Sequence, residues 1–207
     1  MHSAYVLIMA KYFLILIFLS PILTTCSYRW VAHPQHVKDY EKCQSFNSGP
    51  QMLKVPGYDR SYIMVHDCHT MDRQRVSIGI TIFLEEWGRI AKTPLRQNLV
   101  EAVMNDILVE FSDVEKRVNG YSSDGKYLPN VSISGLTIGP TQAWVKTRPG
   151  DLLCETSFAH ELMHIAIWAL KRTDGDPDHL GTKYLGWTAD SMIVIQNTNS
   201  RLCTLGI

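Results

Sequence analysis

The segment 158–168 constrains this chain more than any other part of its sequence. It reads FAHELMHIAIW, contains neither proline nor glycine, and spaces its apolar residues for one buried helical face. We therefore predict a helix over residues 155–171. In that helix His160 and His164 stand one turn apart on the same face, with about 5–6 Å between their Cβ atoms.

Two imidazoles at this separation can share one zinc ion, which binds each nitrogen at about 2.0–2.1 Å. Glu161 projects beside the two histidines rather than between them, so it can reach a water that the metal activates without occupying a coordination position. Its carboxylate would accept a proton from that water and pass it to a leaving amine. The alternative is an amphipathic helix whose two histidines are merely polar.

The sequence HELMH and its flanks, about a dozen residues in all, resemble the active-site helix of the zincin metallopeptidases. The resemblance implies an α+β fold: a minimal zincin-like domain with a small twisted sheet, a backing helix and the HExxH helix. It also implies Zn²⁺-dependent hydrolysis of peptide bonds in protein or peptide substrates, by an endopeptidase rather than an exopeptidase. An edge strand, for which residues 142–146 are the candidate, would pair with extended substrate.

A catalytic zinc ion usually takes three protein ligands and keeps one position open. His179, fifteen residues after His164 in a turn that contains glycine and proline, is our candidate for the third ligand. Metzincins place this histidine six residues after the second one, where this chain has Leu170, and gluzincins use a downstream glutamate, although none follows Glu161 here. The alternative ligands are Asp174, Asp176 and Asp178.

Tyr184 is a candidate catalytic residue, because a phenol can donate a hydrogen bond to the developing oxyanion. The three aspartates of the loop do not form a calcium-binding EF-hand, since the sixth and twelfth positions hold His179 and Leu185 rather than glycine and glutamate. They could instead orient a ligating histidine, and the alternative, favoured for Asp174 and Asp176, is a solvated turn.

The N-terminal region has the layout of a secretory signal. Lys11 precedes a short apolar run, residues 12–23, which Pro21 interrupts. The run ends in Leu-Thr-Thr-Cys, which resembles the lipobox of bacterial lipoproteins, although Thr25 departs from the small residue usual there. We therefore expect a signal peptide over 1–25 and an exported protein held at the cell envelope by a lipid on Cys26. The alternative is an ordinary exported cysteine.

Behind the signal we expect a tether and irregular lead-in segment over 26–60, then the zincin-like domain over 61–207. Within that domain the residue patterns predict the following elements: a strand over 75–85, a long helix over 94–118, strands over 131–138 and 142–146, the motif helix, and a last helix from about Thr188.

If Cys26 carries lipid, the other four cysteines form an even set suited to an oxidising compartment. Four cysteines allow three connectivities. We favour Cys43–Cys68 and Cys154–Cys203, because each pair joins the ends of one half of the chain.

The 20 basic and 20 acidic residues balance, so nothing in the net charge suggests a nucleic-acid partner. We also expect the protein to be a monomer. Two other classes of function stay open. One is a non-catalytic, zinc-binding surface lipoprotein, with a further ligand from His66 or His69. The other is an interaction module without metal. Glu161 argues against both, because neither requires a carboxylate at that position.

Overall fold

The computed structural model describes residues 35–37, 51–65, 71–121, 127–171 and 188–207, all of which belong to one compact unit that runs from Ala32 to Ile207. The expected signal peptide, Cys26, the Cys43–Cys68 pair and the loop with His179 and Tyr184 lie outside these residues. Within the described segments, none of the helices has the length and apolar character needed to cross a bilayer.

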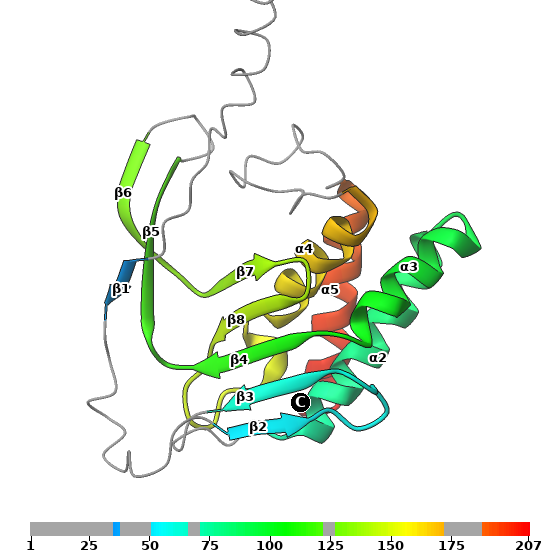
Figure 1. Cartoon of the computed structure of the whole chain (residues 1–207), viewed down its shortest axis with the longest axis horizontal. Coiled ribbons are helices and arrows are strands. Elements are labelled where there is room, and N and C mark those ends of the chain that lie inside the picture. Colours follow the sequence, from blue (N-terminus) through cyan, green and yellow to red (C-terminus); the bar gives the residue numbers. More distant parts are fainter. Residues whose placement is uncertain (1–34, 38–50, 66–70, 122–126, 172–187) are drawn as a thin grey trace, which may run out of the picture. The chain divides into compact units, whose positions relative to one another are not determined.

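The fold is α+β and is built on a mixed five-stranded sheet (Figure 1). The strand order is β2-β3-β4-β8-β7, in which β3, β4 and β8 run parallel while β2 and β7 pair antiparallel at the two ends. The strands are β2 (Gln51–Lys54), β3 (Tyr62–Val65), β4 (Leu108–Ser112), β7 (Gly135–Gly139) and β8 (Gln142–Lys146).

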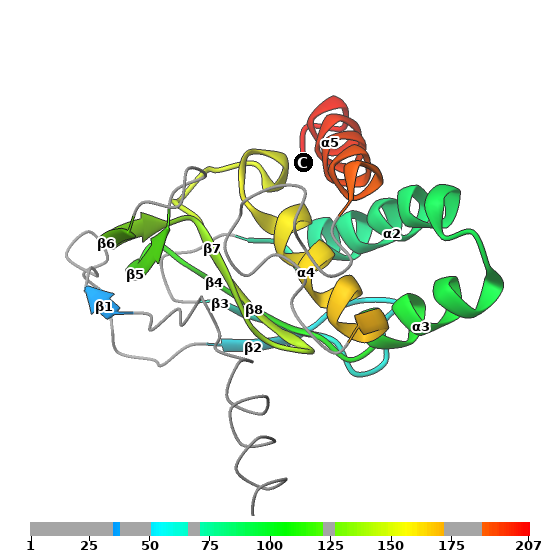
Figure 2. The same ribbon diagram turned by 90° about the horizontal axis from the view of Figure 1, so that it is seen from above.

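The helices lie together on one face of this sheet (Figures 1 and 2). They are α2 (Arg73–Ile90), α3 (Pro94–Met104), α4 (Phe158–Lys171) and α5 (Ala189–Thr204), with a short 3₁₀ turn, η1 (Leu153–Glu155), before α4. Helix α4 is the central one, because it packs against β7 and β8 and also against the other three helices. Its buried side chains therefore join the sheet and the helices into one core.

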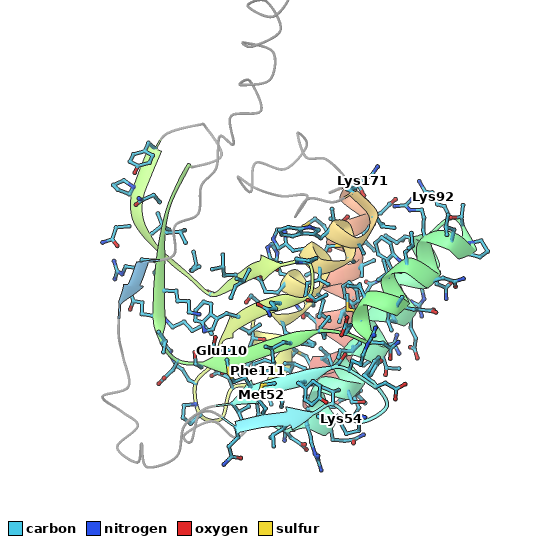
Figure 3. All side chains as sticks on the ribbon, viewed as in Figure 1. Met52, Lys54, Lys92, Glu110, Phe111 and Lys171 are labelled. Carbon is cyan, nitrogen blue, oxygen red and sulfur yellow. A yellow bond between two sulfur atoms is a disulfide. The ribbon has the colours of Figure 1, made fainter. Side chains whose placement is uncertain are left out.

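One contact illustrates how the core forms between the two layers. Phe111 of β4 and Phe158 at the start of α4 are both fully buried, and their ring centroids are 6.1 Å apart. Phe111 follows Glu110 on the same strand (Figure 3), and alternation along the strand sends these two side chains to opposite faces of the sheet. The helix that carries the motif is thus anchored on the sheet by its first residue.

A second, smaller sheet follows the order β1-β5-β6, with bounds Gln35–Val37, Glu115–Tyr121 and Tyr127–Ile133. Lys116 of β5 lies over the ring of Trp144, with its Nζ 4.6 Å from the ring centroid and 3.6 Å from Glu110 Oε2. Burial lowers the pKa of Lys116, although the neighbouring Glu110 carboxylate acts in the opposite direction. These contacts connect β5 to the five-stranded sheet.

Two predicted elements were wrong. Residues 75–85 form part of helix α2 rather than a strand; Asp72 caps this helix by accepting a hydrogen bond from the Gln74 amide at 2.8 Å. The long helix predicted over 94–118 ends at Met104, and the chain continues as strands β4 and β5.

The other predicted elements are close to the observed ones. The interval 131–138 falls across β6 and β7, whereas β8 has the predicted bounds, and helices α4 and α5 begin within three residues of the predicted positions. The Cys154–Cys203 disulfide is present as predicted. However, β8 lies inside the sheet between β4 and β7, so the candidate edge strand over 142–146 was wrong and β7 is the edge strand on that side.

Candidate metal centre

The N-terminus of α4 is fixed by several local contacts. Thr156 Oγ1 accepts a hydrogen bond from the Phe158 amide at 3.2 Å, and the Ser157 carbonyl accepts the Glu161 amide at 2.9 Å. Just before the helix, Cys154 forms its disulfide with Cys203 of α5. The position of the motif helix is therefore tied to the C-terminal helix as well as to the sheet.

The two histidines of α4 point their ring nitrogens at one another. The His160 and His164 Nε2 atoms are 3.0 Å apart, the ring centroids are 4.7 Å apart, and the ring planes meet at 73°. His164 is 5% exposed, whereas His160 is partly exposed. His160 is thus the more accessible member of the pair.

This geometry can be compared with the requirement of a tetrahedral zinc ion. Two nitrogen ligands at about 2.0–2.1 Å from the metal are separated by roughly 3.3–3.4 Å. The observed distance of 3.0 Å between the two Nε2 atoms is slightly shorter than that separation. A small rotation of either ring would remove the difference. The same distance suits a hydrogen bond between neutral imidazoles in the metal-free chain, so the donor pair fits zinc without requiring it.

Glu161 lies beside this pair and is 4% exposed. Its Oε2 accepts a hydrogen bond from Thr137 Oγ1 at 2.9 Å, and the same hydroxyl lies 3.3 Å from the Glu161 carbonyl oxygen. A Cβ added at Gly135 would lie 2.8 Å from Glu161 Cδ, and closer still to Glu161 Oε1 and Ser157 Oγ. The carboxylate therefore rests directly against the backbone of β7.

The structure brings together three of the predicted site residues, His160, Glu161 and His164. The predicted third ligand His179, its alternatives, and Tyr184 all lie outside the described residues. Within the described segments no group of three or more histidine, cysteine, aspartate or glutamate side chains is arranged to hold a metal ion.

Sequence reasoning did not find the partners of Glu161. Thr137 and Gly135 precede it by 24 and 26 residues, in a stretch that carries only a strand pattern. Ser157, whose Oγ donates to the Ser134 carbonyl at 2.8 Å, was also missed. Only the antiparallel pairing of β7 with β8, and the packing of α4 on both strands, brings these residues together.

Comparison of the chain with protein-family models, curated proteins and solved structures finds no match. The resemblance to zincins therefore rests on the HELMH motif alone.

Proposed function

We propose that this protein is a zinc-dependent peptidase in which His160, His164 and His179 hold the metal and Glu161 is the general base. The observation that carries the proposal is the combination of two imidazole nitrogens 3.0 Å apart with a buried carboxylate on the adjoining residue. Burial of a carboxylate costs free energy unless the group is paired or hydrogen-bonded, and Thr137 donates one such hydrogen bond to Glu161. A structural zinc site does not need a carboxylate at this position.

His160, His164 and His179 would hold the zinc ion, which would supply a Lewis acid for the scissile carbonyl and for a water molecule. Glu161 would accept a proton from that water as the water oxygen bonds to the carbonyl carbon, and would deliver the proton to the amine nitrogen as the C–N bond breaks. Tyr184 donates a hydrogen bond to the oxygen that becomes negatively charged. Helix α4 carries the base and two of the three proposed ligands, so that these three side chains keep one geometry through the reaction.

Extended peptide is the substrate that the sheet supports best. Strand β7 is the last strand of the five-stranded sheet and lies directly against Glu161. A peptide that pairs with its outer edge would pass close to the carboxylate, with main-chain hydrogen bonds providing affinity. This favours an endopeptidase, since such pairing needs no free chain end.

The proposal places this enzyme outside the cytoplasm, as a monomer on a lipid anchor at Cys26. The support comes from the apolar run before Cys26 and from the even set of remaining cysteines. The Cys154–Cys203 disulfide agrees with an oxidising compartment.

Metal content tests the ligand assignment. We expect about one zinc per chain in the purified protein, and loss of that zinc in His160→Ala, His164→Ala and His179→Ala. His36→Ala, on β1, is the control and should keep the metal. Zinc retained in full by both the His160 and the His164 variants, or a folded protein that takes up none, would contradict the proposal. Loss in these two but not in His179→Ala would direct the search to Asp174, Asp176 and Asp178.

A further inference from the structure

The edge strand β7 and the residue before it contact the start of α4 at three places. Ser157 Oγ donates to the Ser134 carbonyl at 2.8 Å, just before the strand begins. Gly135 then lies so close to Glu161 that no side chain fits between them. Two residues further, Thr137 Oγ1 donates to Glu161 Oε2 at 2.9 Å. The first and last contacts fix the spacing between strand and helix, and the glycine allows it to be this short.

On this basis we propose that Thr137 is a positioning residue for Glu161, an inference that rests on the proposed peptidase function. An ionised carboxylate only accepts hydrogen bonds, and the Thr137 hydroxyl is a donor aimed at one of its two oxygens. The glutamate side chain has several rotatable bonds, and one fixed oxygen restricts them all. Thr137 thus holds the base in one orientation without touching substrate.

The arrangement also connects substrate binding to the base. Thr137 and Gly135 lie on the strand whose outer edge would pair with the peptide, and both contact Glu161 on the face of that strand that α4 covers. A peptide paired with β7 is therefore held in register with the carboxylate through one short piece of chain. Misplacement of a catalytic group by about 1 Å can cost about a hundredfold in rate.

The test compares Thr137→Val, which removes the hydroxyl and keeps the shape, with Thr137→Ser, which keeps the hydroxyl. Thr141→Val, in the turn that follows β7, is the control for a threonine-to-valine change nearby. We expect Thr137→Val to lower kcat by about tenfold to a hundredfold, with KM and zinc content unchanged. Thr137→Ser should stay within about threefold of the unmodified enzyme, and Thr141→Val should match it.

A second comparison shows whether Thr137 acts through Glu161. In a Glu161→Gln background, Thr137→Val should cause no further loss of the residual rate, because the group that it orients is gone. An equal loss in both backgrounds would overturn the inference. So would a normal kcat in Thr137→Val, or a fall in zinc content that accounts for the whole effect.

Failure of this inference can be told apart from failure of the proposed function. If Glu161→Gln abolishes cleavage while Thr137→Val cleaves normally, the peptidase stands and the positioning role of Thr137 is wrong. If the zinc-loaded protein cleaves no peptide at all, the proposed function is wrong and the positioning role falls with it.

Discussion

Removal of the Cys154–Cys203 disulfide should lower stability by an amount that follows from its place in the chain. The bond joins residues 49 apart, linking the turn before α4 to α5. Closing a loop of that length removes about 4 kcal/mol of conformational entropy from the denatured chain at 25 °C. Cys154→Ser/Cys203→Ser should therefore lower the free energy of unfolding by about 4 kcal/mol. For a domain of this size that corresponds to roughly 8–16 °C in Tm.

Urea denaturation of the double variant and the oxidised protein, followed by circular dichroism, measures this difference. A reducing agent should bring the unmodified protein down to the stability of the variant. The stability of the double variant should also be measured with and without reductant. A change in its stability on reduction would come from other cysteines, such as the predicted Cys43–Cys68 pair. A loss below about 1 kcal/mol would refute the loop-closure reasoning.

Two further predictions concern buried contacts. Burial raises the pKa of Glu86, but hydrogen bonds from Arg201 and Asn197 and the charge of Arg89 outweigh it, so the folded-state pKa is lowered. The resulting stability is present above the unfolded-state pKa of about 4.3 and is lost as pH falls through the folded-state value. Glu86→Gln should cost about 1.5–3 kcal/mol at pH 7, with a smaller difference near pH 3, by denaturation at both pH values; an unchanged difference would contradict this. Gly135→Ala should lower stability by about 1–3 kcal/mol through overpacking against Glu161, whereas an added methyl at Gly139 meets nothing within 4 Å and should change Tm little; equal Tm values for the two variants would contradict the close approach.

The error at α2 shows a limit of local sequence reasoning. The run of β-branched residues between Arg75 and Glu85 favoured a strand, because such residues are enriched in sheets. The side chains that α2 buries include Val76, Ile80, Phe83 and Trp87, which recur at the spacing of a helix. The helical period was thus present in the sequence, and burial against the core outweighed local propensity.

The long helix predicted over 94–118 failed for a different reason. A spacing of four runs from Leu99 to Phe111 and matches a helix throughout. Yet Asn105 ends α3, and the buried residues that follow, Ile107, Val109 and Phe111, alternate as in a strand. A helical and a strand pattern coincided over this stretch.

The wrong placement of β8 at the edge of the sheet had two causes, one in the local sequence pattern and one in the sheet topology. Ala143, Trp144 and Val145 are all buried, as expected of a strand covered on both faces. Three consecutive apolar residues argue against an edge strand, so this part of the error could have been avoided from the sequence. That β7 forms the edge beside α4 could not, because the pairing depends on the whole sheet.

The residues of the candidate site also fall into two groups: those that the sequence predicts within one element, and those that only the fold brings in from another element. His160 and His164 stand one turn apart on one helix, so their spacing alone predicts that they meet. Thr137 and Gly135 reach Glu161 from a separate strand, and nothing in their local sequence marks them out. Local periodicity therefore predicted the residues within one element, while contacts between elements required the fold.

Cleavage of a quenched-fluorescent peptide library by the purified protein and by its Glu161→Gln variant, with zinc measured in both samples, tests the central claim most directly. We expect about one zinc per chain in both proteins, and a rate at least about a hundredfold lower in the variant, because a general base contributes that much or more. Equal cleavage by the two proteins would show that Glu161 is not the base. Full zinc occupancy with no cleavage by the unmodified protein would contradict the assignment as a peptidase and favour a non-catalytic zinc-binding protein.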